Sequence, residues 1–275
     1  MACREYINFE PSPHTPLSGS MFIDCFLEAG VPDETMVCLN GNSFTGHAIA
    51  SSKLDLMSFT GSARVAQHIQ TVTHLSLRKT IFELGGTNSL IIFPDCDLDS
   101  AASAVIESGF SNTGQRCAAG SKVIVHNDVF DQVMSIVVER LDSLKFGIGD
   151  GCFAGPLIDE AAVARYKDVT ERYIKYGFVV RKVGQVVGDS PFTALPVLVE
   201  IPQSKQDYCA EEMFAPIVHF YRFEKYEEAI YIANNSNYGL TSAVWTQNIS
   251  LMHELKLGLN SGVLNFNGPT HGSEF

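Results

Sequence analysis

Short apolar segments alternate with helical segments along this chain, and this alternation limits the folds that the chain can adopt. The apolar segments Met36–Leu39 and Leu54–Phe59 have the length of buried strands, and a glycine lies within two residues of the end of each. Residues 18–30 and 62–70 are expected to be helices. Because strands that alternate with helices form parallel βαβ units, the sequence predicts an α/β fold.

The alternation restarts at Glu83, which we therefore expect to begin a second α/β domain, so that the domains are 1–82 and 83–275. Asp99 and Asp128 are the expected N-caps of the first two helices of that domain. In the earlier helix, apolar residues at helical spacing define one face (Met21, Phe22, Cys25, Phe26 and Ala29). Further helices are expected near 160–176, 225–235 and 249–258, and strands at 122–126, 178–183, 196–201, 217–223, 243–246 and 263–266.

Composition excludes several classes of protein. With 275 residues, 45% of them hydrophobic and 18% charged, the chain can bury a substantial core and is expected to be globular. A formal net charge of −12 argues against a nucleic-acid partner, because phosphate binding needs clustered Lys and Arg. No apolar run is long enough for a membrane span, and the N-terminus has no signal-peptide pattern. Seven cysteines without a paired framework indicate a reducing compartment, so the expected location is cytoplasmic.

A glutamate and a cysteine lie 34 residues apart in two unusual settings. Glu83 is followed by Leu84 and two glycines, and Cys117 lies among glycines and small residues in the segment Asn112–Gly120. A thiolate can attack a carbonyl carbon, and a nearby cation or a helix N-terminus lowers the pKa of a thiol. We expect Arg116 and a helix beginning after Cys117 to favour the thiolate. A carboxylate can then activate water to release the acyl group.

Each of these residues also has a simpler interpretation. An isolated cysteine is most often a buried structural thiol, which fits Cys25 and Cys38 on their apolar segments. Glu83 could be an exposed carboxylate at a strand end, although two following glycines suggest close backbone approach. The eight histidines have no metal-ligand spacing and the chain has no Cys-x-x-Cys pair, so we expect no metal site.

The chain resembles the aldehyde dehydrogenase superfamily in five ordered segments that span nearly its whole length. Glu83–Gly86 and Gly114–Cys117 match the two active-site signatures of that family, at its spacing. Ser58–Ser62, Glu211–Pro216 and Tyr226–Leu240 match three further segments. The resemblance implies an aldehyde dehydrogenase-like α/β fold, with a partial Rossmann-type NAD(P)-binding domain followed by an α/β catalytic domain.

The resemblance also implies a reaction and a set of site residues. Cys117 would attack an aldehyde to form a thiohemiacetal, hydride would leave for the nicotinamide of NAD or NADP, and a thioester would remain. Glu83 would be the general base for the deacylating water. The implied cofactor-binding residues are Thr60, Gly61 and Ser62 at the phosphates, Leu84 and Gly85 near the nicotinamide, Glu212 at the nicotinamide ribose and Phe214 beside the ring.

The chain departs from the family pattern at several positions. Glu10 stands where relatives have a Lys that binds the adenine ribose, and a carboxylate cannot supply the donors of an ammonium. Alanines stand at 66 and 215 where relatives have glycine. The asparagine that completes the family's oxyanion hole would precede this chain, and losing such a donor lowers the rate on the order of a hundredfold.

The sequence leaves two functions open. The first is NAD(P)-dependent oxidation of an aldehyde to a carboxylic acid. The segment Asn265–Thr270 resembles branches that act on semialdehydes or aromatic aldehydes, among them succinylglutamate-semialdehyde dehydrogenases. The second is a catalytically silent, truncated relative with a binding or assembly role. Family members are nearly twice as long, so this chain could be a natural short form, a fragment or an engineered form. Homo-oligomers are expected of the full-length family, and the oligomeric state of this chain stays open.

Overall fold

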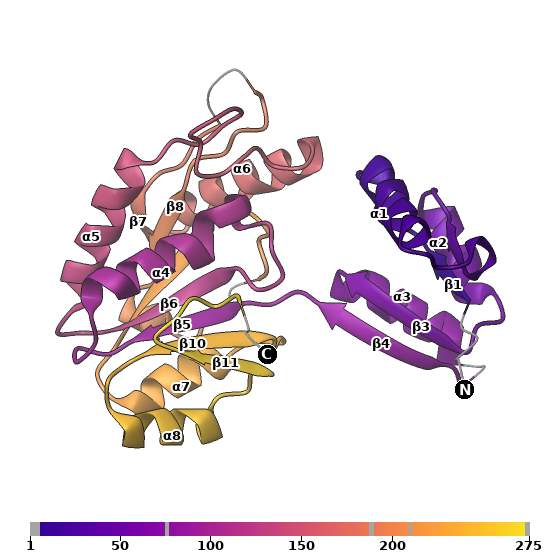
Figure 1. The fold of residues 1–275 in the computed structure, drawn as a ribbon. Coiled ribbons are helices and arrows are strands. Elements are labelled where there is room, and N and C mark those ends of the chain that lie inside the picture. Colours follow the sequence, from indigo (N-terminus) through magenta and orange to yellow (C-terminus); the bar gives the residue numbers. More distant parts are fainter. Residues whose placement is uncertain (1–5, 75–76, 187–189, 209–210, 273–275) are drawn as a thin grey trace. The chain divides into compact units, whose positions relative to one another are not determined.

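The structure is a computed structural model that describes residues 6–74, 77–186, 190–208 and 211–272. The chain divides into two compact units, residues 1–84 and 85–275, which are shown in Figure 1 and are described one at a time. No helix of the described residues is long and apolar enough to cross a membrane.

The first unit contains two pairs of parallel strands. Strand β1 pairs with β2, and β3 pairs with β4, with Thr60 opposite Glu83 and Gly61 opposite Leu84. The expected strands and helices of this region are present, and β1, α2 and β4 are additional to them. The elements are β1 (Ile7–Phe9), α1 (Pro16–Glu28), η1 (Asp33–Thr35), β2 (Met36–Cys38), α2 (Ser43–Ser51), β3 (Leu56–Gly61), α3 (Ala63–His74) and β4 (Lys79–Leu84).

The sequence analysis predicted the wrong buried face for α1. Met21 is 67% exposed and Phe22 is also exposed, whereas Gly19 and Ile23 are the buried residues of this helix. Gly19 packs so closely on Pro11 that a Cβ at position 19 would lie 2.4 Å from the proline Cβ. Apolar residues occur on more than one side of α1, so their spacing alone could not indicate which side contacts β2.

The second unit is built on a seven-stranded sheet with strand order β11-β10-β5-β6-β9-β8-β7. All neighbouring pairs are parallel except β7 with β8, which are antiparallel. The elements are β5 (Asn88–Ile92), α4 (Leu98–Phe110), η2 (Ser111–Gly114), β6 (Gly120–His126), α5 (Phe130–Ser143), α6 (Glu160–Lys175), β7 (Val179–Lys182), β8 (Val197–Glu200), η3 (Gln203–Lys205), β9 (Ile217–Phe223), α7 (Tyr226–Asn234), β10 (Thr241–Trp245), α8 (Ile249–Gly258) and β11 (Val263–Phe266).

Helices cover both faces of this sheet, and its central strands are buried on both sides (Figure 1). In β5, Leu90 and Ile92 pack with α4 and α5, whereas Ile91 packs into the other cluster, with α6, α7 and α8. Parallel strands covered on both faces are uniformly apolar rather than alternating, as β5 is from Leu90 to Ile92. The predicted α/β fold is confirmed.

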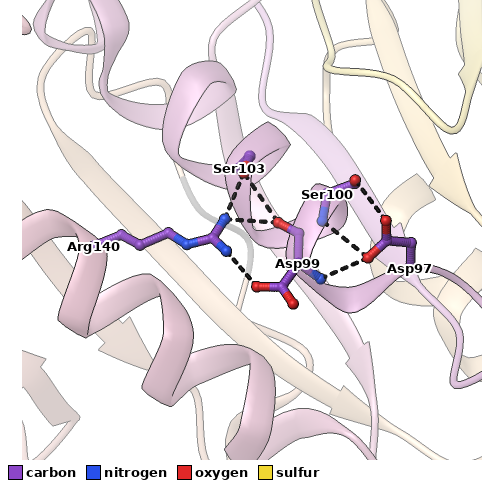
Figure 2. A network of polar contacts seen from close by, with 5 residues as sticks. All are labelled: Asp97, Asp99, Ser100, Ser103 and Arg140. Carbon is purple, nitrogen blue, oxygen red and sulfur yellow. Dashed lines mark hydrogen bonds and ion pairs between the residues drawn. The ribbon is translucent and has the colours of Figure 1, made fainter.

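Helix α4 begins at a different aspartate from the one expected. Asp97 is its N-cap: its Oδ1 accepts from the backbone N–H groups of Asp99, at 3.1 Å, and Ser100, at 3.3 Å. The Ser100 hydroxyl also donates to Asp97 Oδ2 at 2.8 Å, and these bonds lower the pKa of Asp97. Asp99 instead binds Arg140 of α5, which also donates to Ser103 (Figure 2). The N-cap of α5 is Val129 rather than Asp128.

Candidate functional site

The structure places the predicted site residues in two groups, one in each unit. Thr60, Gly61, Glu83 and Leu84 lie in the first unit, at the carboxyl ends of β3 and β4, where they are register partners. Glu83 is exposed. Ser62 also lies in the first unit, whereas Cys117, Gly85, Glu212 and Phe214 belong to the second. Leu84 is the last residue of the first group and Gly85 is the first residue of the second, and the two are adjacent in the chain.

Ser62 starts helix α3. Its carbonyl oxygen accepts from the N–H groups of Val65 and Ala66, and its hydroxyl accepts from Val65 at 3.4 Å. The first N–H groups of a helix have no intrahelical partners and suit an anion such as phosphate. Ala66, which replaces the family's glycine, is buried in this helix, so the additional methyl group is accommodated by packing. The segment 60–62 therefore leads from the end of β3 to a helix N-terminus, whose first N–H groups suit an anion.

Cys117 is exposed and lies in a turn between η2 and β6. The expectation that a helix begins after this cysteine is wrong, because the next regular element is the strand that starts at Gly120. No helix N-terminus is therefore available from this side to stabilise the thiolate. The small residues after Cys117 allow the chain to turn into a buried central strand, in which Gly120 packs against Ser108.

The residues before the cysteine are fixed by packing and hydrogen bonds. Gly114 has φ +67°, and a Cβ there would lie 2.4 Å from the carbonyl oxygen of Ala215. The buried Thr113 donates to Gly155 O at 2.5 Å. The Gln115 amide donates to Pro156 O at 3.2 Å and accepts from the Ile158 N–H at 2.9 Å. The polar residues of this signature thus anchor the turn to the segment 155–158.

Two residues that the sequence analysis missed bind the carbonyl groups of the cysteine turn itself. Asn88 Nδ2 donates to Cys117 O and to Ala119 O, both at 2.8 Å. The Thr270 hydroxyl donates to Ala118 O at 2.7 Å. Both side chains are buried. The signal for Asn88 was present in the sequence, since an asparagine at the start of a buried strand needs buried hydrogen-bond partners.

Glu212 lies against the paired glycines that follow Leu84. Its Oε1 accepts from the Gly86 N–H at 3.2 Å, and a Cβ on Gly85 would lie 2.0 Å from Glu212 Oε2. Burial raises the pKa of Glu212, while the Gly86 N–H and Arg165 oppose the increase. The two glycines therefore allow a close approach, as expected, and the group that approaches their backbone is the Glu212 carboxylate.

A small, open pocket borders this carboxylate. Arg116, Glu212 and Phe214 line it, and Phe214 is 40% exposed with φ +50°. The hydroxyl of Ser121, also on the lining, has no hydrogen-bond partner within the described part of the chain. The lining segments precede β5, β6 and β9, so the pocket lies at the amino ends of parallel strands, whereas ligands of open α/β sheets usually bind at the carboxyl ends.

Glu10 follows β1 and contacts helix α2. A Cβ on Gly46 would lie 3.1 Å from Glu10 Oε2. Burial raises the pKa of Glu10, and a hydrogen bond from the Gly46 backbone partly offsets this. Since Gly46 lies in the first turn of α2, the carboxylate occupies the end of the helix that favours negative charge.

No group of three or more His, Cys, Asp or Glu side chains that could hold a metal ion occurs among residues 6–74, 77–186, 190–208 and 211–272. The five cysteines in those ranges (Cys25, Cys38, Cys96, Cys117 and Cys152) are free.

Comparison with known proteins gives concordant results. The profile of the "Aldehyde dehydrogenase family" matches residues 1–274. Sulfoacetaldehyde dehydrogenase of Neptuniibacter caesariensis is 31% identical over 272 residues, which are 98% of this chain and 59% of the relative. The crystal structure of lactaldehyde dehydrogenase from Escherichia coli matches 98% of this chain and 57% of that chain, with 29% identity and a TM-score of 0.91. PnpE in complex with nicotinamide adenine dinucleotide matches 98% of this chain and 56% of that chain, at 29% identity and a TM-score of 0.91.

The chain therefore spans between half and two thirds of the length of these relatives.

Proposed function

Because this chain belongs to the aldehyde dehydrogenase family, we propose that it carries the machinery for NAD(P)-dependent oxidation of an aldehyde to a carboxylic acid, with Cys117 as the nucleophile. The observation that supports this most is the setting of Cys117, an exposed thiol on a turn whose neighbouring carbonyls are bound by buried side chains. A structural cysteine would instead be buried, and its packing would not require that the neighbouring carbonyl groups be held by buried side chains.

The proposed reaction has two stages. The Cys117 thiolate bonds to the aldehyde carbon, and the carbonyl oxygen takes the negative charge of the thiohemiacetal. The nicotinamide supplies the chemistry of a hydride acceptor, and loss of hydride from the same carbon leaves a thioester on Cys117. Glu83 then takes a proton from water, the water oxygen bonds to the acyl carbon, and the carbon–sulfur bond breaks to release the acid.

The residues present fit NAD(P). The start of α3 suits the diphosphate, with Thr60, Gly61 and Ser62 as the binding turn. The Glu212 carboxylate provides acceptors for ribose hydroxyls. Any side chain at Gly85 would collide with that carboxylate, so this glycine lets Glu212 lie against the backbone. Leu84, beside Gly85, and the half-exposed Phe214 are proposed to contact the nicotinamide.

The finer features of the function are also proposals. Relatives include a sulfoacetaldehyde dehydrogenase, 1-pyrroline-5-carboxylate dehydrogenases and a benzaldehyde dehydrogenase, which supports a lean toward semialdehydes or aromatic aldehydes. Free cysteines and an acidic composition support a cytoplasmic location. A net charge of −12 supports the absence of a nucleic-acid partner. Assembly into homo-oligomers is proposed for the family's longer chains and is left open here.

Mass spectrometry of the intact protein tests the proposal. The protein is incubated with NAD or NADP and a panel of aldehydes that includes anionic ones, and acyl adducts are mapped by peptide. An adduct on Cys117 that is absent from the Cys117→Ser variant is the expected result. An adduct that forms only on other cysteines would contradict the assignment of the nucleophile.

A second function, that of a catalytically silent relative with a binding role, is favoured by one observation. Glu10 places a carboxylate at the start of α2, where it would oppose an anionic cofactor group. Absence of any Cys117 adduct at saturating cofactor, with a Cys117 thiol that still reacts with iodoacetamide, would support this function over the first.

A further inference from the structure

We propose that Asn88 is the positioning residue of the nucleophile, because its amide holds the Cys117 turn in the conformation that the thiol needs for attack. The inference rests on the proposed function of Cys117. It extends that function to a residue of strand β5, which lies 29 positions from Cys117 along the chain.

Three hydrogen bonds fix the orientation of the Asn88 amide. Nδ2 donates to the carbonyl oxygens of Cys117 and Ala119, both at 2.8 Å, and Oδ1 accepts from the Thr241 N–H at 3.1 Å. A carbonyl oxygen can only accept and a backbone N–H can only donate, so the reversed amide would lose all three bonds. Asn88 therefore ties the turn to the first residues of both β5 and β10.

The turn is held at three consecutive carbonyl groups. Asn88 binds those of residues 117 and 119, and the Thr270 hydroxyl binds that of Ala118. Thr270 is itself fixed, since its N–H donates to Ser108 Oγ of α4 at 3.0 Å. A planar peptide group turns as one body, so binding its oxygen also sets the direction of its N–H. The three peptide groups that follow the Cys117 Cα are thus oriented from the buried side.

The physical consequence is preorganisation. Cys117 lies in no helix or strand, so the ladder hydrogen bonds of regular structure do not hold it. Asn88 is 2% exposed, which leaves little access for a water to replace its amide when it is removed. The carbonyls of Cys117 and Ala119 would then turn toward other donors. A displacement of about 1 Å at a reacting group can slow a reaction by about 100-fold.

The chemistry of the three contacts restricts the residue at this position. Aspartate has the size of asparagine but lacks the two N–H donors and brings a negative charge to two carbonyl oxygens. Alanine removes all three bonds. Thr270 allows a finer comparison, because Thr270→Ser keeps the hydroxyl and Thr270→Val removes it at nearly constant size.

The test uses p-nitrophenyl acetate, which needs no cofactor. A thiolate that attacks its carbonyl carbon expels p-nitrophenolate and forms a thioester, so the first turnover appears as a coloured burst. The burst rate is measured across pH for the full chain and for Asn88→Ala, Asn88→Asp, Thr270→Val and Thr270→Ser. The matched control is Asn234→Ala. Asn234 is also an amide that bonds two backbone groups, Gly258 O at the end of α8 and the Asn260 N–H, both at 2.8 Å, but it has no bond to the cysteine turn.

We expect the burst to slow by about 10- to 100-fold in Asn88→Ala and Asn88→Asp. Thr270→Val should slow it less, and Thr270→Ser should restore the normal rate. Hydrogen exchange of the peptide that contains residues 115–119 should speed up in the Asn88 variants and stay unchanged in Asn234→Ala, even where the thermal midpoints of the variants are equal.

The outcomes separate the two proposals. A wild-type protein that gives no burst and no acyl adduct on Cys117 would refute the proposed nucleophile. A wild-type burst that Asn88→Ala leaves unchanged, or that Asn234→Ala slows equally at the same thermal midpoint, would overturn the role of Asn88 alone.

Discussion

Acidification should destabilise the second unit through a buried histidine that takes no part in the proposed reaction. His219 of β9 is 0% exposed. Its Nε2 lies 2.6 Å from the Tyr173 hydroxyl and its Nδ1 lies 3.2 Å from Ser121 O. Because a carbonyl oxygen only accepts, Nδ1 carries the proton and Nε2 accepts from the tyrosine. The ring is therefore neutral in its native hydrogen-bond pattern.

The sign and the size of the effect follow from the pKa. Burial, with a smaller contribution from the charge of Lys122, lowers the pKa of His219 from 6.5 to about 4, although the bond to Ser121 opposes the decrease. As the pH falls below 6.5, His219 becomes protonated in the unfolded chain, whereas in the folded chain it stays neutral until about pH 4. The free energy of unfolding should therefore fall across this window by about 3 kcal/mol, at about 1.4 kcal/mol for each pH unit.

Urea denaturation followed by tryptophan fluorescence can measure this loss. Trp245 is the only tryptophan of the chain and lies buried in β10, so it reports on the second unit. His219→Gln, which does not titrate, should be less stable at pH 7.5 and should lack this part of the pH dependence. His253→Gln, at an exposed position of α8, is the matched control and should keep it. Equal pH dependence in wild type and His219→Gln would refute the reasoning.

Three further predictions concern the proposed site. Iodoacetamide at neutral pH should label Cys117 first and Cys96 last, because burial and the charge of Asp95 raise the pKa of the Cys96 thiol to about 11; preferential labelling of any other cysteine would count against Cys117. Calorimetry should find weak NAD binding that Glu10→Lys strengthens, whereas submicromolar affinity of the wild type would contradict the assigned effect of this carboxylate. In any chain that turns over, Glu83→Gln should leave the NADH burst intact and slow the later release of acid at least 100-fold, and equal steady-state rates would exclude Glu83 as the base.

The sequence predicted the elements whose patterns are strongest. The ends of α8, β9 and β11 agree with the predicted ranges to the residue. Helix α2 was missed because its small and polar residues carry a weak periodic signal. The α4 cap was misassigned because Asp97 and Asp99 lie two residues apart, and only the three-dimensional position of Arg140 determines which of them caps the helix.

The candidate site was predictable where it is local in the sequence. The motifs at Glu83 and Cys117 are contiguous runs, and so their roles could be inferred from resemblance. Asn88 and Thr270 act on the cysteine turn across 29 and 152 residues, a distance at which a single sequence carries no pairing information. The helix expected after Cys117 failed because a strand of the central sheet begins there and tertiary pairing decides that conformation.

The side-chain hydrogen bonds described above for the cysteine turn all arise within the second unit, whereas the proposed base, Glu83, belongs to the first. The two stages of the proposed chemistry are therefore separable by mutation. Replacement of Glu83 alone should leave a protein that accepts one acyl group and keeps it, a stoichiometric reagent rather than a catalyst. Such a protein would react once with an activated acyl compound and remain acylated on Cys117.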